Sequence, residues 1–412
     1  MRPAAAVPPV VGLGVAALVV LLTGQDGSQA PASGDAVPEQ LAGYSYLTGS
    51  VSQSPPGRVV ALWQHGYGVE FLDFPQAVVL GADGDTYRRV DVAEGRAGSE
   101  TQGDPAPMLL SPDGTRVAVG DHDLERPDLV VVDLTTGETT SHPLPTGRSV
   151  VPVAWSADGR TVASVLSEDP TNPYSGSRIR GDVGLVDLAD HTSEVLDADG
   201  TATAAAFSPD GSELAVERAD RLAVVDLADG GERELEADGV LAGPAAWSPD
   251  GRLLAVTTTR PAPAAPASID DPGIPTGLAF VDPTGQGGDV PEPLPLSATG
   301  PGRVLGWTGP DEVLTVLAVE GADPCCGPDA QTLSAVPLDG TQPRTLMRMN
   351  DLGSYGIGRF QLAAAAAEAL EVVDPDDVDR GPWPWPLRGV LAVVAGLLAW
   401  VVARAVLRRA TR

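Results

Sequence analysis

The stretch "FSPDGSELAV", residues 207–216, decides the fold, because near-copies of it recur along the chain. Three close copies are "LSPDGTRVAV" at 110–119, "WSADGRTVAS" at 155–164 and "WSPDGRLLAV" at 247–256. Each copy joins an aromatic residue or Leu, a four-residue turn signal and an alternating apolar run. Pro at the second turn position fixes φ, and Gly at the last position tolerates a positive φ. The pattern therefore predicts a tight turn between two β-strands.

Two weaker copies extend the series. "QSPPGRVVALW" has Ser54 at the turn position and Pro56 in place of Asp, and "GWTGPDEVLTVL" has Thr308 there. Successive turn positions lie 40 to 60 residues apart. Each turn is followed by a second segment, such as "RLAVVDLADGGERELE" at 221–236, that reads as a strand, an Asp/Gly turn and another strand. Four antiparallel strands per repeat of this length are typical of a β-propeller blade.

Six copies predict an all-β, six-bladed propeller whose blades are four-stranded antiparallel sheets. A seven-bladed ring is the alternative, with a seventh blade assembled from residues 35–50 and 350–372, where no repeat signature is visible. The segment "RFQLAAAAAEALEVV", residues 359–373, is expected to be helical because it is rich in alanine.

The "[FW]-S-P-D-G-x-x-L-A-V" units resemble the WD-repeat-like blades of the TolB propeller, which the propellers of prolyl-oligopeptidase-type peptidases share. The resemblance covers roughly residues 45–350 and is specific for the fold rather than for an activity. It departs from the family pattern at both ends, where the Ser54 copy lacks the Asp and the Thr308 copy lacks the directly following Gly. Neither the amino-terminal mixed domain of TolB nor the hydrolase domain of those peptidases is found in the sequence.

The Ser, Asp and Gly of the turn recur, whereas a catalytic nucleophile is needed once. We therefore interpret these residues as structural, and we predict no catalytic residue among them. A G-x-S-x-G nucleophile elbow does not occur in the sequence. The structural turn residues are Ser111, Asp113, Gly114, Ser156, Asp158, Gly159, Ser208, Asp210, Gly211, Ser248, Asp250 and Gly251.

An apolar segment near the N-terminus, Val10–Leu22, follows Arg2. We interpret residues 1–24 either as a signal peptide, with "APA" at 30–32 as the cleavage site, or as an N-terminal membrane anchor. Residues 25–44 are polar and small and are expected to be a linker.

A transmembrane helix is predicted over residues 387–408, around the uncharged run "GVLAVVAGLLAWVVA". Trp383 and Trp385 precede it as an aromatic belt, and arginines cluster after it. The positive-inside rule then places the short tail 409–412 in the cytoplasm and the propeller outside the cell membrane. The sequence thus resembles a membrane-anchored bacterial propeller protein, with the propeller over residues 45–372 and an acidic, Pro-rich stalk over 373–386.

The chain is strongly acidic, with 56 Asp and Glu against 26 Lys and Arg and a formal net charge of −30. Nucleic-acid binding needs clustered positive charge, so nucleic acid is excluded as a partner. We interpret the acidity as a solvated surface that resists aggregation.

Candidates for chemistry are few. Asp121, His122 and Asp123 lie together and are weak candidates for binding a divalent cation, since no second His stands at metal-binding spacing. We predict no cofactor. The adjacent Cys325 and Cys326 either form a strained vicinal disulfide, which we favour, or stay reduced in an exposed loop.

These observations predict a membrane-tethered, extracytoplasmic propeller that is no enzyme and that binds a protein or a small ligand. The alternative is a propeller hydrolase or lactonase with a metal in the central channel. Two long insertions, residues 167–182 and 260–277, each follow the inner strand of their blade and should emerge on one face. We expect the binding rim there.

Overall fold

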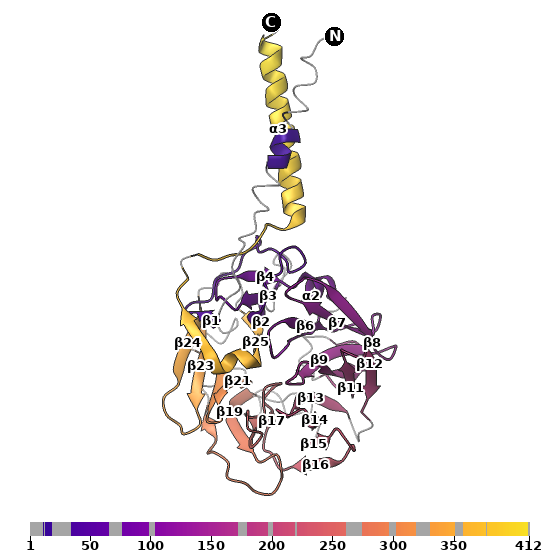
Figure 1. Cartoon of the computed structure of the whole chain (residues 1–412), viewed down its shortest axis with the longest axis vertical. Coiled ribbons are helices and arrows are strands. Elements are labelled where there is room, and N and C mark those ends of the chain that lie inside the picture. The colour runs from indigo at the N-terminus through magenta and orange to yellow at the C-terminus, as the bar shows by residue number, and fades with distance from the viewer. Residues whose placement is uncertain are drawn as a thin grey trace.

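Six four-stranded antiparallel sheets form a ring in the computed structural model of the protein (Figure 1), so the six-bladed prediction is confirmed and the seven-bladed alternative is wrong. The structure describes residues 11, 13–18, 34–65, 76–98, 104–171, 179–196, 201–218, 221–260, 274–295, 302–318, 330–350, 357–375 and 377–410.

The blades are numbered here around the ring and their strands are given from the centre outward. Blade 1 contains β25 (Ile357–Leu362), β2 (Val59–His65), β3 (Gln76–Gly81) and β4 (Tyr87–Arg89). Blade 2 contains β5 (Met108–Leu110), β6 (Arg116–Val119), β7 (Asp128–Asp133) and β8 (Thr139–Pro143). Blade 3 contains β9 (Ser149–Trp155), β10 (Thr161–Ser167), β11 (Asp182–Asp187) and β12 (Thr192–Val195). Blade 4 contains β13 (Ala202–Phe207), β14 (Glu213–Arg218), β15 (Leu222–Asp226) and β16 (Glu232–Leu235). Blade 5 contains β17 (Val240–Leu241), β18 (Leu254–Arg260), β19 (Ile274–Val281) and β20 (Leu294–Pro295). Blade 6 contains β21 (Val304–Gly309), β22 (Glu312–Ala318), β23 (Ala330–Pro337) and β24 (Arg344–Asn350). In Figure 1, β9, β13, β17, β21 and β25 lie toward the centre of the ring, and β8, β12, β16 and β24 lie toward its rim.

The ring is closed by pairing the two ends of the repeat region. β25, from the C-terminal side, supplies the innermost strand of blade 1 and runs antiparallel to β2, from the N-terminal side. A second closure is the parallel pair of β1 (Asp35–Pro38) and β26 (Leu370–Val373). The segments that the sequence offered for a seventh blade therefore complete blade 1 and tie the ends together.

The helix predicted over residues 359–373 is wrong. The segment forms the end of β25, then the 3-10 helix η2 (Ala364–Ala369), then β26. The side chain of Gln361 spans to the innermost strand of blade 2, where its amide donates to Met108 O over 2.9 Å and its oxygen accepts from Leu110 N over 2.8 Å. Strand pairing and these contacts across the ring override the helical preference of alanine.

Three blades carry a Trp just before the turn, and its indole N–H reaches back to the preceding blade. The bonds run from Trp155 to Leu109 O over 3.2 Å, from Trp247 to Ala206 O over 3.0 Å, and from Trp307 to Ala245 O over 2.9 Å. Phe207 occupies the same position in blade 4 and has no donor to offer.

The segment predicted to be a stalk touches the outer edge of blade 1. Tyr87 N donates to Asp379 O over 2.8 Å, and Gly49 N donates to Arg380 O over 2.7 Å. The Asp379 carboxylate also pairs with Arg88 over 2.9 Å, and the Arg88 side chain is 3% exposed. The polypeptide is thus bonded to the ring just before its apolar C-terminal helix begins.

That helix, α3 (Trp385–Ala410), is 26 residues long and reaches a mean hydropathy of 2.4, so it is a candidate membrane span. It leaves the ring at blade 1, on the side opposite β15 and β16 (Figure 1). Near the N-terminus, residues 11 and 13–18 are helical, and the rest of the predicted signal peptide or anchor lies outside the described residues. Cys325 and Cys326 also lie outside them.

Candidate functional site

The repeated turn has the same internal hydrogen bonds in its four close copies. In blade 4, Ser208 Oγ donates to Asp210 Oδ1 over 2.7 Å and accepts from Glu213 N over 2.9 Å, while Gly211 has φ +73°. The matching serines, Ser111, Ser156 and Ser248, bond to Asp113, Asp158 and Asp250 over 2.6, 2.6 and 2.7 Å. Each hydroxyl is therefore engaged within its own turn.

The turn carboxylates are held in the ionised form. The hydrogen bond from Ser156 lowers the pKa of Asp158, and the backbone N–H of Arg160 adds to the effect. In the same way, the hydroxyl of Ser208 lowers the pKa of Asp210. A carboxylate that accepts several hydrogen bonds is stabilised as an anion. These turns therefore place fixed negative charges on one face of the ring.

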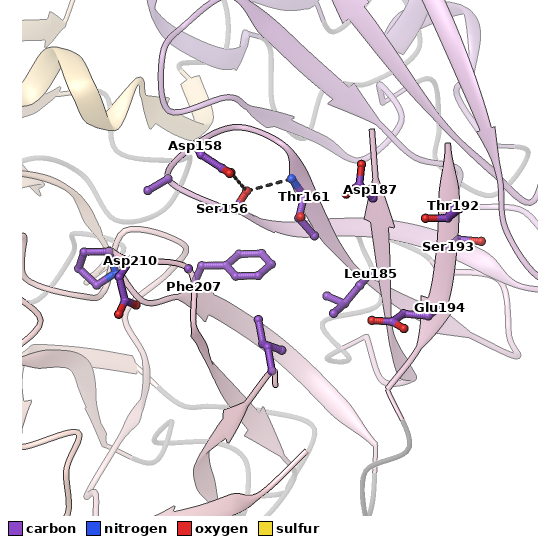
Figure 2. Close-up of a pocket in the computed structure, with 14 residues that line it drawn as sticks. Ser156, Asp158, Thr161, Leu185, Asp187, Thr192, Ser193, Glu194, Phe207 and Asp210 are labelled. Carbon is purple, nitrogen blue, oxygen red and sulfur yellow. Dashed lines mark hydrogen bonds between the residues drawn. The ribbon is translucent and has the colours of Figure 1, made fainter. Parts of the chain in front are cut away.

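A pocket of about 500 Å³ opens between blades 3 and 4 on that face (Figure 2). One wall is the turn of blade 3 with β11 and β12, and the other is the turn of blade 4. The volume is in the range of pockets that bind a small ligand or a side chain. Its lining residues are Ser156, Ala157, Asp158, Thr161, Leu185, Asp187, Thr192, Ser193, Glu194, Phe207, Pro209, Asp210, Gly211 and Leu227.

The pocket has an apolar floor and an acidic rim. The Phe207 ring lies between Asp210 and Leu185 in Figure 2, and Phe207 is 6% exposed. Asp158 and Glu194 stand on the blade 3 side. An aromatic face surrounded by carboxylates suits a ligand that is cationic at one end and apolar along its stem.

Asp187 adds a further negative charge to the pocket. Backbone N–H groups of Asp190 and Ala189 donate to Asp187 Oδ1 over 2.9 and 2.8 Å, and the first of these bonds is the main cause of the lowered pKa of Asp187. Arg160 offsets this charge in part, since its Nη2 lies 3.8 Å from Asp187 Oδ2. That guanidinium approaches from solvent, because the Arg160 side chain is 57% exposed.

The residues proposed as weak metal ligands have other partners. Asp121 pairs with Arg96 over 3.4 Å and also accepts from Asp123 N over 2.9 Å. His122 Nδ1 contacts Thr171 Oγ1 over 2.6 Å. Burial raises the pKa of Asp121 and lowers that of His122 to about 4. Within the described ranges, no three His, Cys, Asp or Glu side chains gather as metal ligands.

The sequence reasoning assigned none of the pocket residues to a site. It named Phe207 as a core residue and Ser156, Asp158, Pro209, Asp210 and Gly211 as turn residues. A usable signal lies five residues after each turn serine, where the copies differ. That position holds Arg116, Thr161, Glu213 and Leu253 in blades 2 to 5. The substitution of a long side chain by threonine marks the place of the pocket.

The long insertions predicted to form a binding rim connect β10 to β11 and β18 to β19. Both join the second and third strands of a blade, so they emerge on the face opposite to the turns. Residues 172–178 and 261–273 of these insertions lie outside the described residues. The binding rim remains a prediction.

The chain is a six-bladed β-propeller, and its fold is similar to those of solved propeller structures. TolB from Acinetobacter baumannii matches with 18% identity and a TM-score of 0.50, covering 75% of this chain and 67% of that one. Dipeptidyl peptidase 4 from Porphyromonas gingivalis matches with 16% identity and a TM-score of 0.39, over 59% of this chain and 39% of that one. The β-propeller domain of Cps50 (Swd1) from Myceliophteria thermophila matches with 15% identity and a TM-score of 0.39, over 62% and 74%. No protein-family model matches the chain, and no curated protein matches it. The fold is a TolB-like β-propeller.

Proposed function

We propose that the protein is a membrane-tethered propeller that binds another protein outside the cytoplasm. The observation that carries this proposal is the exposure of α3. Only 6% of the most apolar 18-residue stretch of α3 is buried within the molecule, and Leu398 and Val390 are 62% and 60% exposed. An apolar surface of this extent is unfavourable in water and is matched by the hydrocarbon of a bilayer.

The contact between Asp379 and blade 1 supports a defined position of the ring relative to the bilayer. Arg380 Nη2 donates to Gly43 O over 2.7 Å, and its guanidinium lies 5.7 Å from the centre of the Tyr87 ring. These bonds shorten the free segment between the ring and α3. Blade 1 would then face the membrane, and blades 3 and 4 would extend away from it, where a partner has access.

The arginines around α3 support an extracytoplasmic ring. Arg404, Arg408 and Arg409 follow the apolar run. Before the run, Arg380 is bonded to the ring of blades, and Arg388 is a single positive charge that lies 5.6 Å from the centre of the Trp385 ring. Positive charge concentrates on the cytoplasmic side of membrane spans. The C-terminus would therefore be cytoplasmic.

Binding is the activity we propose, in place of catalysis. The repeated serines are engaged in their turns, and the pocket between blades 3 and 4 combines an aromatic floor with an acidic rim. This arrangement supports recognition of a cationic group. The competing hypothesis of a metal-dependent hydrolase has no specific observation in its favour.

The test is site-specific photo-crosslinking of the full chain in its own membranes. A photo-reactive residue replaces Glu194, which lines the pocket, or Thr140, which occupies the matching exposed position of blade 2. Adducts with one protein from position 194 and not from position 140 are expected. The proposal is wrong if neither this crosslinking nor a pull-down yields a partner, or if alkaline carbonate extracts the chain without detergent.

A further inference from the structure

The interface between blades 2 and 3 contains an arginine at the place where the next interface has its pocket. Arg116 lies on β6 and crosses to blade 3, where Nη2 donates to Gly159 O over 2.7 Å. Its guanidinium lies 5.2 Å from the centre of the Trp155 ring. A charged hydrogen bond and a cation–π contact together anchor this side chain.

Residues of the pocket occupy the same places in the next interface. Thr161 lies opposite Asp187 in the β10–β11 ladder, just as Arg116 lies opposite Asp133 in the β6–β7 ladder. Phe207 replaces Trp155 before the turn, and Gly211 replaces Gly159 within it. The pocket therefore contains the aromatic face and the glycine turn of an arginine site, without the arginine.

The surroundings of the two glycines show the difference directly. A Cβ added to Gly159 would lie 2.6 Å from Arg116 Nη2, whereas a Cβ added to Gly211 would have nothing within 4 Å. The residues at the position of Arg116 in the other close copies have other surroundings, and the turn glycine Gly251 of the next interface has only Pro209 Cδ, at 4.0 Å. Glu213 accepts from Arg233 over 2.9 Å, and Leu253 is only 4% exposed.

We propose that the pocket between blades 3 and 4 receives an arginine side chain from the partner protein. This inference rests on the proposed function and names the chemistry by which the partner is recognised. The molecule supplies the template for the bound state, since Arg116 shows how a guanidinium sits between an aromatic ring and a turn carbonyl.

The bound guanidinium stacks on Phe207 and donates to the carbonyl of Gly211. Carboxylates of Asp158, Asp187 and Asp210 balance its charge, and Leu185 packs against its methylene stem. Arginine suits this site better than lysine, because its planar group both stacks and donates in fixed directions. The acidity of the whole chain favours the approach of a basic partner.

The first test titrates the purified full chain in detergent micelles with acetyl-arginine-amide and follows the leucine methyl signals by NMR. We expect saturable shifts at Leu185 and Leu227 with a dissociation constant on the order of a few millimolar, as suits contacts of a single side chain. Acetyl-citrulline-amide has the same shape without the charge. Equal shifts with citrulline, equal shifts with the lysine analogue, or no shifts with arginine would overturn the proposal.

The second test moves the arginine between the two interfaces. T161R supplies the pocket with its own guanidinium and should weaken probe binding at least about tenfold. R116T empties the preceding interface and should create a second site for the probe, visible at Leu188, which corresponds to Leu227. Unchanged binding by a folded T161R, or no second site in a folded R116T, contradicts the proposal. If one variant fails to fold, probe binding by the other variant still tests the proposal.

The two proposals fail in different ways. A partner that crosslinks at position 194 of both the wild type and T161R would keep the binding function and refute the arginine site. Probe binding by the wild type without any partner in membranes would do the reverse.

Discussion

The interface between blades 2 and 3 and the interface between blades 3 and 4 are built from the same repeat, yet one is closed by polar contacts and the other is hollow. The first has the indole bond of Trp155, the guanidinium of Arg116 and, on the opposite face, the contact of His122 with Thr171. Both have a backbone pair on the opposite face, Asp121–Val150 in the first and Gly181–Ala202 in the second, but the second has mainly apolar side chains between its blades.

This difference shows that substitutions at a few positions decide whether an interface is filled or contains a pocket, while the fold of the blade is unchanged. Arg116 corresponds to Thr161, and Trp155 corresponds to Phe207, while the turn keeps its hydrogen bonds in both copies. Blades are held together by neighbour contacts. A repeat can therefore turn one interface into a binding site while its neighbour remains a structural joint.

Acidification should weaken the closed interface first, through His122. Its pKa in the folded state is about 4, below the ordinary 6.5, because burial disfavours the charged ring. The folded state thus binds fewer protons than the unfolded state, so this stabilisation is complete above pH 6.5 and is lost as the pH falls toward 4. The contribution of His122 to the free energy of unfolding should drop by up to about 3 kcal/mol in this window, measured by urea titrations with circular dichroism. Burial raises the pKa of Glu94 to about 7, so Glu94 contributes with the opposite sign over an overlapping range and has to be separated from the histidine.

A matched variant isolates this histidine from other titrating groups. In H122N the amide can still contact Thr171, but it cannot take up a proton. Subtracting its pH profile from that of the wild type should leave the loss between pH 6.5 and 4. Superimposable profiles would show that His122 does not carry the effect.

Replacing each of the two turn glycines by alanine should lower the free energy of unfolding by different amounts at the two interfaces. Gly159 and Gly211 have φ values of +67° and +73°, so alanine at either position costs about 1–2 kcal/mol of strain. At Gly159 the new Cβ also displaces Arg116, which adds about 1 kcal/mol. G159A should therefore destabilise the chain more than G211A.

The double variant R116T/G159A provides the control for this comparison. Without the guanidinium, alanine at position 159 should cost about as much as alanine at position 211. A persistent difference in the free energy of unfolding would mean that the two turns differ for another reason.

The repeat allowed the fold to be predicted because its turn has a local chemical cause. Ser, Asp and Gly bond within the turn in the four close copies, and two weaker copies continue the spacing, so the six copies gave the number of blades. The closure of the ring by β25 and β2 could not be predicted from the repeat. The last residues of β25 directly precede the alanine-rich run that forms η2, and pairing with β2, some 300 residues away along the chain, makes β25 a strand.

The candidate site was predicted less well, because the pocket depends on the absence of large side chains between two blades. The sequence reasoning looked for chemistry in loops and in charged clusters such as Asp121–Asp123. The pocket arises instead where Thr161 and Phe207 are smaller than Arg116 and Trp155, and a cavity appears only once two blades face each other. The sequence shows where the aligned copies differ. It does not show at which of these positions the space between two blades stays empty.

Removing the arginine of the closed interface should have a moderate effect. R116T loses the hydrogen bond to Gly159 and the contact with Trp155, which together contribute about 1–2 kcal/mol at a partly buried site. T161R should have the opposite sign, with a gain of up to about 1 kcal/mol, because it fills a cavity and meets carboxylates. Urea titration of both variants measures the pair. A destabilised but folded T161R would show that the two interfaces are not equivalent.

The smallest difference should be the one between two indole bonds, and it tests the comparison most directly. W155F leaves Leu109 O without the N–H and weakens the face on which Arg116 lies, so it should cost about 1.5 kcal/mol. W247F removes the corresponding bond to Ala206 O, but the residue matching Arg116 there is Glu213, so it should cost only about 1 kcal/mol. The difference between the two, measured with and without R116T, reports what the cation–π contact contributes. Equal costs would mean that the guanidinium is held by Gly159 alone, and the stacking of a partner arginine on Phe207 would then lose its template.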